Sequence, residues 1–570
     1  MTTVEWRQAR SATGLLRTFS DAEVIESSDV HVAQRLSALA KESDETVALA
    51  VALAVRALRN GSVCVDLRSV EQQVGVNDLP WPNCDDWFTA VNRSALSGQP
   101  PVLRIDGDLL YLDRYWLEEQ QVCRDVLTMV EATPKQASPD IDRLFPKGFE
   151  EQRAAAEVAL SQGLTVLTGG PGTGKTTTVA RLLALLTAGT HLRIALAAPT
   201  GKAAARLQEA VQLEVGRLEP ADQRALAGLH ATTLHRLLGS RPDTSARFRH
   251  NRGNRLPHDV IVVDETSMVS LTMMARLLEA VRPDARLILV GDPDQLASVE
   301  AGAVLADLVD GLDSAKIAEL RTSHRFGESI GALASAIRDG DANKAVDVLR
   351  AGGEHIEWIE DDEPSEHLRK VLVPHALTLR QAALLGDGAA ALAALDEHRL
   401  LCAHRHGPYG VRYWNRQTER WLTEATGEPI WASWYPGRPI LVTANDYGLG
   451  LYNGDTGVTL LKDGVLRAVI AGTEPLEFAT SRLADADTLH AMTIHKSQGS
   501  QANEVTVLMP PEESRILTRE LFYTAVTRAK EKIRVVGPET AVREAVERRA
   551  VRASGLGRRL HDRRLADTDV

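Results

Sequence analysis

A glycine-rich stretch at residues 164–178 constrains the fold of this chain most. It reads LTVLTGGPGTGKTTT, an apolar β-branched run that breaks into glycines and continues into a helix-forming segment. The phosphate-loop pattern G-x-x-x-x-G-K-[ST] is matched by Gly169, Gly174, Lys175 and Thr176. Glycines let backbone N–H groups converge on phosphate oxygens, and the N-terminus of the following helix adds positive potential. The stretch therefore predicts a nucleotide-binding loop between a strand and a helix rather than an ordinary glycine-rich turn.

The residue types of this loop indicate ATP and Mg²⁺ as cofactors. Lys175 has the length and charge to reach the β- and γ-phosphates, and the Thr176 hydroxyl is a suitable Mg²⁺ ligand. The residues predicted to contact the nucleotide from the loop are Gly169, Gly170, Pro171, Gly172, Thr173, Gly174, Lys175, Thr176 and Thr177.

Apolar strands and helical segments alternate after the loop, as a parallel α/β sheet requires. Strands are expected at 194–198, 260–263 and 287–290. The second strand delivers Asp264, predicted to hold Mg²⁺ together with Thr176, and Glu265, predicted to activate the attacking water. The third is followed by GDPDQ, in which Gln295 is expected to sense the γ-phosphate.

Length and composition limit the remaining possibilities. A chain of 570 residues suggests roughly three or four domains. No apolar stretch approaches the length of a membrane span, and the N-terminus has no apolar signal segment. The four cysteines lie far apart, which favours a reducing cytoplasm over disulfides or a cysteine metal site. A formal net charge of −12 argues against general coating by nucleic acid but allows a local basic channel.

Residues 1–133 are expected to form a separate unit. The segment 43–61 predicts a buried helix, and 102–112 predicts a hairpin across Asp106-Gly107. The proline-containing stretch 131–142 is typical of a linker. Because the unit has no phosphate-binding, metal-binding or nucleophile pattern, a role in docking a partner is expected.

The order of eight sequence blocks resembles that of superfamily-one DNA helicases, and most closely their RecD branch, which moves 5′ to 3′. The blocks are GGPGTGKTTT, APTGKAAARL, TTLHRLLG, VVDETSM, LVGDPDQLASV, SHRF, TIHKSQGS and LFYTAVTRAK, within about two-thirds of the chain. The resemblance implies an α/β protein with two RecA-like motor domains, at 143–325 and 326–570, and ATP between them. It also implies a mainly helical N-terminal domain over residues 1–133.

Several site residues are implied by this resemblance. Gln152 would contact adenine, and Arg325 and Arg528 would be arginine fingers from the second motor domain. Their task would be to stabilise charge on the transferring phosphoryl group. The predicted catalytic set is then Lys175, Asp264, Glu265, Gln295, Arg325 and Arg528.

The same blocks imply contacts with DNA. Hydroxyls, histidines and a lysine at loop ends suit phosphate contacts, which carry affinity without sequence information. The implied residues are Thr200, Gly201, Lys202, His235, Thr493, His495, Lys496 and Ser497. After TIHKSQGS the family usually has an acidic residue, whereas this chain has Gln501, which puts any charge-based role there in doubt.

Two inserts interrupt the motor. Residues 240–258 are rich in arginine and are expected to form a basic β-hairpin, with the turn-forming residues 251–254. Arg247, Phe248 and Arg249 are the predicted DNA contacts there, and a solvated flexible loop is the alternative. Short apolar stretches in residues 436–490 predict a small β-barrel, which resembles the SH3-like insert of the RecD branch. The arginine-rich segment 543–564 is expected to be a frayed helix and tail.

The function that follows is an ATP-dependent 5′–3′ DNA helicase. The resemblance implies a RecD-type (alpha) subunit of exodeoxyribonuclease V, in a heterotrimer with RecB-like and RecC-like partners. Such a complex would process single-stranded and duplex-end DNA in recombinational repair, with the nuclease in a partner chain.

Three alternatives remain open. The chain could be a stand-alone RecD-like helicase, although residues 1–145 show no helix-hairpin-helix pattern. A structural subunit with an inactive motor is opposed by the intact Lys175, Asp264 and Glu265. A nuclease is opposed by the lack of a clustered Asp/Glu/Lys constellation outside the motor.

Overall fold

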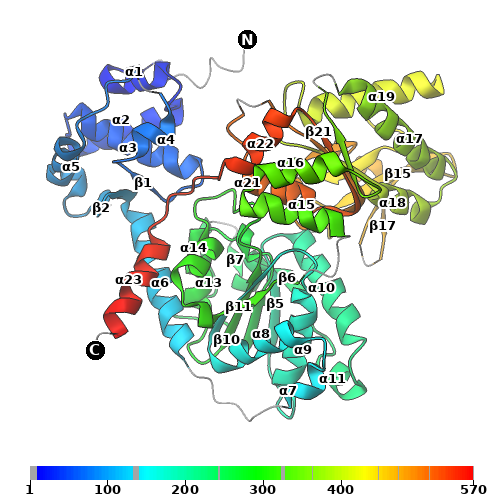
Figure 1. Ribbon diagram of the computed structural model, residues 1–570, viewed down its shortest axis with the longest axis horizontal. Helices are drawn as coiled ribbons and strands as arrows, with labels where there is room; N and C mark the ends of the chain where they lie inside the picture. The colour runs from blue at the N-terminus through cyan, green and yellow to red at the C-terminus, as the bar shows by residue number, and fades with distance from the viewer. Residues whose placement is uncertain are drawn as a thin grey trace.

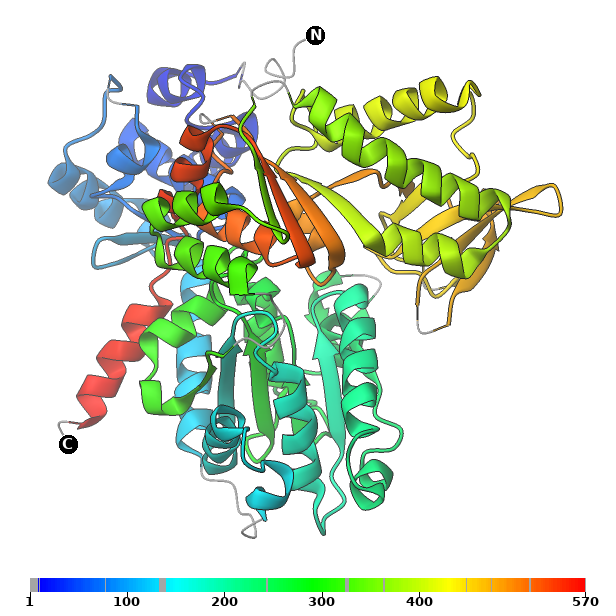
Figure 2. The ribbon, with the colours of Figure 1, turned by 45° about the vertical axis from the view of Figure 1, so that its right-hand side comes forward.

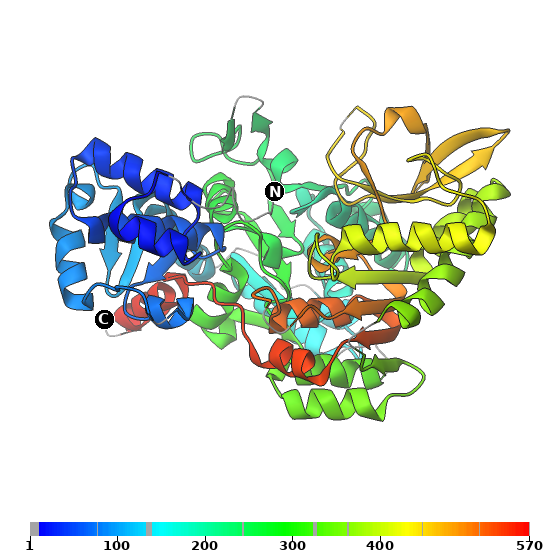
Figure 3. The same cartoon turned by 90° about the horizontal axis from the view of Figure 1, so that it is seen from above.

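The computed structural model describes residues 9, 11–76, 78–132, 140–241, 244–322, 328–361, 364–446, 448–472, 474–511 and 514–568. A helical N-terminal unit lies beside two α/β units, and the last helix returns to the N-terminal side of the molecule (Figure 1). Seen from above, the N-terminal unit and the insert at 436–490 lie at opposite ends of the molecule (Figure 3).

The N-terminal unit combines helices with a small antiparallel sheet of order β1-β3-β2. The predicted hairpin across Asp106-Gly107 is confirmed by the pairing of β2 with β3. The predicted helix at 43–61 is α3, which buries most of its length and is capped by Asp44, whose side chain accepts from the backbone N–H of Thr46 (2.8 Å). The elements are α1 Gly14–Asp21, α2 Ser27–Ala40, α3 Glu45–Arg59, β1 Cys64–Asp66, α4 Val70–Val74, α5 Cys84–Arg93, β2 Leu103–Asp106 and β3 Leu109–Leu112.

Helix α6 (Asp113–Glu131) joins this unit to the first α/β unit. Its apolar side shares one hydrophobic core with α13 (Leu271–Ala280). Gln121 Nε2 donates to the carbonyl of Ala275 (2.8 Å). The domain limit at residue 133 stays a prediction. Helix α6 packs against both the N-terminal unit and the first α/β unit.

The first α/β unit is built on a six-stranded sheet of order β11-β4-β10-β9-β5-β6, in which every pair is parallel. The strands are β4 Leu164–Gly169, β5 Ile194–Ala198, β6 Ala231–Thr233, β9 Val260–Val263, β10 Arg286–Gly291 and β11 Ile317–Leu320. The helices are α7 Ile141–Leu144, α8 Glu150–Ser161, α9 Lys175–Thr187, α10 Gly201–Val215, α11 Pro220–Ala225, α12 Leu234–Leu238, α13 and α14 Val304–Gly311. Carboxyl ends of parallel strands meet at one edge, which is where such sheets bind ligands.

The second α/β unit has a five-stranded parallel sheet of order β12-β21-β20-β13-β19. The strands are β12 Ile356–Ile359, β13 His398–Cys402, β19 Ala491–Thr493, β20 Ala502–Leu508 and β21 Ala529–Val536. The helices are α15 Glu328–Asp339, α16 Ala342–Ala351, α17 Ser365–Leu384, α18 Gly388–Glu397, α19 Val411–Thr426, α20 Ile494–Ser497, α21 Arg519–Val526 and α22 Glu539–Glu547. Two parallel α/β units in sequence agree with the predicted fold class.

Both inserts contain β-structure at the predicted places. In the first, β7 (Ser240–Arg241) pairs antiparallel with β8 (Thr244–Phe248), and the residues that join them, 242–243, lie outside the described part. The predicted hairpin turn at 251–254 is misplaced: Asn251 and Asn254 close a separate turn through reciprocal backbone bonds of 3.1 and 3.0 Å.

The second insert is an antiparallel sheet of order β17-β16-β15-β14-β18. Its strands are β14 Pro439–Val442, β15 Thr456–Lys462, β16 Val465–Ile470, β17 Leu476–Ala479 and β18 Ala486–Thr488. Its classification as SH3-like stays a prediction.

The arginine-rich C-terminus is not a frayed tail. Helix α23 (Leu556–Thr568) lies along α6 and α14 (Figure 2). Arg559 Nε donates to Glu119 Oε2 (3.2 Å), and Ser554 Oγ donates to Glu119 Oε1 (2.9 Å), while Glu119 itself is fully buried. A buried carboxylate is costly unless a cation and hydrogen-bond donors compensate it, and the C-terminal segment supplies both.

Candidate nucleotide site between the two units

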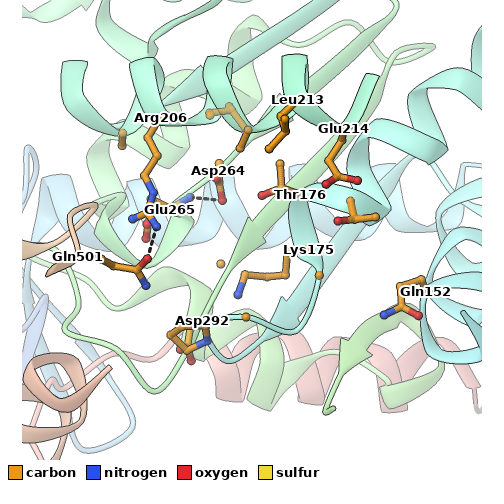
Figure 4. A pocket seen from close by; sticks show the side chains of 18 of the residues that line it. Gln152, Lys175, Thr176, Arg206, Leu213, Glu214, Asp264, Glu265, Asp292 and Gln501 are labelled. Carbon is orange, nitrogen blue, oxygen red and sulfur yellow. Dashed lines mark hydrogen bonds between the residues drawn. The ribbon is translucent and has the colours of Figure 1, made fainter. Parts of the chain in front are cut away.

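A cavity of about 630 Å³ lies between the two α/β units (Figure 4). Predicted site residues that line it are Gln152, Pro171, Gly172, Gly174, Lys175, Thr176, Thr177, Asp264, Glu265, Gln295 and Arg528. Gly169, Gly170 and Thr173 belong to the same loop but are not part of its lining. Figure 4 shows Gln152 and Arg206 at opposite ends of the cavity, with Lys175 between them.

The phosphate loop runs from the end of β4 to the start of α9. Gly174 is the N-cap of α9 and has a φ of +86°, a conformation that glycine adopts without strain. Lys175 Nζ donates to the carbonyls of Gly169 (2.6 Å) and Gly170 (2.9 Å), which holds the ammonium at the mouth of the loop. The backbone N–H groups at the start of α9 and this ammonium make an anion site.

Two acids follow β9 at the same edge of the sheet. Asp264 Oδ1 accepts from the backbone N–H of Glu265 (2.8 Å), and Glu265 has a φ of +51°, an uncommon conformation for a residue other than glycine. Burial and the neighbouring Glu265 raise the pKa of Asp264 to about 6, against the opposing effect of Lys175. The carboxylate of Asp264 and the hydroxyl of Thr176 are oxygen ligands of the kind that Mg²⁺ prefers.

A chain of hydrogen bonds crosses from the second unit to the first. Arg528 Nη2 donates to Gln295 Oε1 (2.9 Å), and Gln295 Nε2 donates to Asp292 Oδ2 (2.9 Å). Tyr523 on α21 also donates to Asp292 Oδ2 (3.2 Å). Burial lowers the pKa of Arg528 to about 10 and raises that of Asp292. The sequence prediction missed Asp292 and Tyr523, although both belong to blocks that were recognised.

A second contact between the units joins Arg206 on α10 to Gln501, just before β20. Arg206 Nη2 donates to Gln501 Oε1 (2.8 Å), and both side chains line the cavity (Figure 4). Gln501 had been singled out because it replaces an acidic residue. The sequence analysis did not predict Arg206 as a site residue, although it lies in the helicase-like block APTGKAAARL.

Gln152 lies at one end of the cavity (Figure 4). Gln152 is 5% exposed, and its Nε2 donates to the carbonyl of Thr173 (3.5 Å). Phe149, three residues before Gln152, also lines the cavity, and the Arg181 guanidinium lies 4.1 Å from the centre of its ring. The arrangement suits a flat base, and sequence reasoning found only Gln152 of these residues. Arg325, the other predicted finger, lies outside the described residues.

The predicted DNA-contacting hydroxyls are used within the fold. Thr200 accepts from the N–H of Ala203 (3.2 Å) at the start of α10, and Thr493 accepts from the N–H of Lys496 (3.3 Å) at the start of α20. Ser497 Oγ donates to the carbonyl of Ile494 (2.7 Å). These bonds fix the loop ends.

The second insert lies on the loop at Thr200–Lys202. A Cβ atom on Gly201 would lie 2.3 Å from Tyr452 Cγ, so only glycine lets this ring approach. Arg236 Nη1 donates to the Tyr452 hydroxyl (3.3 Å). Burial lowers the pKa of Lys202 to about 8, and Asp455 of the insert acts in the opposite direction. The predicted DNA-contacting lysine is therefore partly covered here.

The basic hairpin presents its two predicted arginines but not its aromatic ring. Arg247 and Arg249 are exposed, whereas Phe248 is 6% exposed, with its ring centre 5.8 Å from that of His235. The predicted base-stacking role of Phe248 disagrees with this arrangement, because its ring belongs to the hydrophobic core of the first unit.

Two further predicted DNA contacts lie in α20. His495 and Lys496 are partly buried, and burial lowers the pKa of both side chains. His495 is therefore mainly neutral at pH 7, which suits a hydrogen bond more than a charge contact.

No helix within the described ranges is long and apolar enough to cross a membrane. Three family models match the chain. An AAA domain matches residues 149–361, a UvrD-like helicase C-terminal domain matches 488–536, and the N-terminal domain of the RecBCD enzyme subunit RecD matches 21–111. The first of these supports nucleotide binding by the first α/β unit.

Relatives match over almost the whole chain. The RecBCD enzyme subunit RecD of Mycolicibacterium smegmatis is 73% identical, over 96% of this chain and 99% of that protein. The protein of that name from Mycobacterium tuberculosis is 66% identical, over 97% of this chain and 98% of its own length. The ATP-dependent RecD2 DNA helicase of Deinococcus radiodurans is 31% identical, over 77% of this chain and 56% of that protein.

Proposed function

This chain belongs to the family of RecD subunits of the RecBCD enzyme, and we propose that it is an ATP-driven motor that unwinds DNA by moving 5′ to 3′. It works in a complex with RecB-like and RecC-like subunits, in the cytoplasm, on single-stranded DNA exposed at duplex ends. The nuclease activity that completes recombinational repair resides in a partner chain. The stand-alone RecD2 helicase matches over little more than half of its own length, which supports the subunit over the stand-alone reading.

The observation that best supports the assignment as a motor is the hydrogen-bond chain across the cavity. Arg528 of the second unit reaches Gln295 of the first, and Gln295 bonds Asp292. A change at the nucleotide therefore alters the contact that holds the two units together. Relative movement of two such units is what a translocating motor requires.

The roles of the residues follow from their positions. The loop N–H groups and Lys175 bind the phosphates of ATP, and Gln152 with Phe149 binds the base. Arg528 stabilises negative charge on the transferring phosphoryl group, and Glu265 orients the attacking water. Thr176 and Asp264 would hold Mg²⁺, which when bound neutralises phosphate charge.

DNA is proposed to run across the loops that carry the predicted contacts. Lys202, His235 and Lys496 lie near such loop ends, and Arg247 and Arg249 present positive charge from the hairpin. Gly201 offers backbone contacts. Thr200, Thr493, His495 and Ser497 fix or extend the same loops.

The test measures ATP hydrolysis and unwinding by the full chain. Hydrolysis should rise with single-stranded DNA, and a duplex with a 5′ overhang should unwind while one with a 3′ overhang does not. Lys175→Ala should lower kcat/KM for ATP by roughly a thousandfold or more, because a phosphate-binding charge is lost.

Arg224→Gln is the matched control, since Arg224 is an exposed cation of the same unit. Wild-type protein that hydrolyses ATP equally well with and without DNA, or Lys175→Ala turnover within a few-fold of wild type, would overturn the motor assignment.

A further inference from the structure

The segment between β19 and β20 touches the nucleotide site at three places. Gln498 Nε2 donates to the carbonyl of Leu296 (2.8 Å), directly after the sensor residue Gln295. The carbonyl of Ser500 accepts from Arg528 Nη1 (3.5 Å), and Gln501 accepts from Arg206. The segment begins at Thr493 and α20, where DNA contacts are expected, so it lies between the DNA path and the nucleotide.

Of these three contacts, the one made by Arg206 involves a positive charge that its partner does not neutralise. In the described part of the chain Arg206 forms no ion pair with a carboxylate, and Gln501 bonds it without neutralising it. Its charge nevertheless acts within the cavity: it lowers the pKa of both Asp264 and Arg528. Arg206, Asp264 and Arg528 line the same cavity, and Figure 4 shows Arg206 and the predicted magnesium ligand Asp264 near each other.

A glutamine and an acid would act differently at position 501. A carboxylate would form an ion pair with Arg206 and add negative charge to a cavity that takes a triphosphate. The neutral amide keeps the contact between the units and leaves the positive charge for the nucleotide.

Resting on the proposed motor function, we propose that Arg206 and Gln501 form a positioning pair that transmits DNA binding at residues 493–501 to the nucleotide site. DNA on α20 fixes the segment, the segment fixes Gln501, and Gln501 orients Arg206 beside Asp264. Gln498 acts in parallel on the Gln295 loop. Neither member of the pair is assigned a step in the chemistry itself.

The experiment measures steady-state ATP hydrolysis by the full chain with and without oligo(dT), and takes the ratio of the two kcat values. Arg206→Gln and Gln501→Leu should each lower this ratio by roughly five- to twentyfold, the range of an ordinary coupling between sites. The double variant should be no worse than either single variant, because both remove the same bond. Arg206→Lys should recover most of the ratio, since an ammonium also donates to an amide oxygen.

The Gln501→Glu variant distinguishes the effect of the hydrogen bond to Arg206 from the effect of added negative charge in the cavity. It keeps a partner for Arg206, so the ratio should stay within about twofold of wild type, while KM for ATP should rise by roughly three- to tenfold through repulsion of the triphosphate. Gln381→Glu, an exposed glutamine of α17, is the matched control and should change neither value.

Circular dichroism and the unfolding temperature of each variant establish that it is folded. Single variants whose ratios match wild type, or whose losses multiply in the double variant, would overturn the pair. Wild-type protein without any DNA-stimulated hydrolysis would instead overturn the proposed function, and the pair with it.

Discussion

The two α/β units meet the nucleotide cavity with opposite ends of their sheets. In the first unit the contributing residues follow carboxyl ends of strands: Pro171 after β4, Asp264 after β9 and Asp292 after β10. In the second unit they precede amino ends: Gln501 before β20 and Arg528 before β21. Similar architecture thus supplies a binding platform on one side and a set of side-chain donors on the other.

The difference is also one of charge. Burial raises the pKa of Asp264 and of Asp294 in the first unit to about 6 and lowers the pKa of Arg528 in the second to about 10. Each group is costly to bury alone, and charges of the other unit offset part of that cost. Glu265 and Asp292 of the first unit act on Arg528, and Arg338 of the second acts on Asp294. The first unit is therefore expected to bind nucleotide by its backbone and Lys175, and the second to act on turnover.

Replacing the buried arginine of the second unit tests this division most strongly. Arg528→Ala should lower kcat for ATP by roughly 10²- to 10³-fold, the usual loss when a preorganised donor to a developing charge is removed. Affinity for a fluorescent ADP analogue, measured by titration, should change by less than about threefold, because the binding groups lie in the first unit. Arg412→Ala, an exposed arginine of α19, is the control. An equal loss of affinity and turnover would place the second unit in the binding platform and break the comparison.

A smaller loss of turnover is expected when Tyr523, also of the second unit, is changed. Tyr523→Phe keeps the ring but removes the hydrogen bond to Asp292, so kcat should fall by about three- to tenfold, the worth of one such bond. The KM for ATP should stay close to wild type in the same steady-state assay. Tyr413→Phe changes an exposed tyrosine and should have no effect. An unchanged kcat for Tyr523→Phe would show that Gln295 alone positions Asp292.

The burial of Asp264 in the first unit should affect how the unfolding temperature depends on pH. The raised pKa of Asp264 means that folding disfavours its ionised form, so the cost is absent below pH 3.8 and complete above about pH 6. In metal-free buffer, Asp264→Asn should raise the unfolding temperature at pH 8 by about 2–6 °C and leave it nearly unchanged at pH 4. Scanning calorimetry at both pH values measures this. A gain of equal size at pH 4 would trace the effect to packing instead of charge.

Local sequence patterns were sufficient to predict those structural elements that one short segment forms by itself. The strands at 194–198 and 260–263 match β5 and β9, because continuous apolar runs that end in polar residues leave few other structures. The phosphate loop is likewise local, since its glycines, lysine and helix start are adjacent. The hairpin turn was misplaced because residues 251–254 have turn chemistry but no paired strands beside them.

Contacts between distant segments could not be read in this way. Arg559 and Glu119 are separated by 440 positions and form a buried pair, so an arginine-rich end that looks solvated by composition is packed in the structure. Phe248 has a basic neighbourhood in sequence, yet its ring faces His235 and the core. Burial depends on what packs over a residue, and composition does not contain that information.

The sequence by itself determined the first α/β unit, the phosphate loop with Lys175 and Thr176, and the acids after β9, because each is specified by neighbours in the chain. The second α/β unit was expected only from the resemblance of the motif blocks to a known family. Only the tertiary structure decided that Arg206 bonds Gln501, that Tyr523 reaches Asp292 and that α23 returns to α6. The physical reason is range: strand, turn and helix signals act over a few residues. A hydrogen bond between two units depends on how hundreds of residues pack, and each partner alone carries no mark of the other.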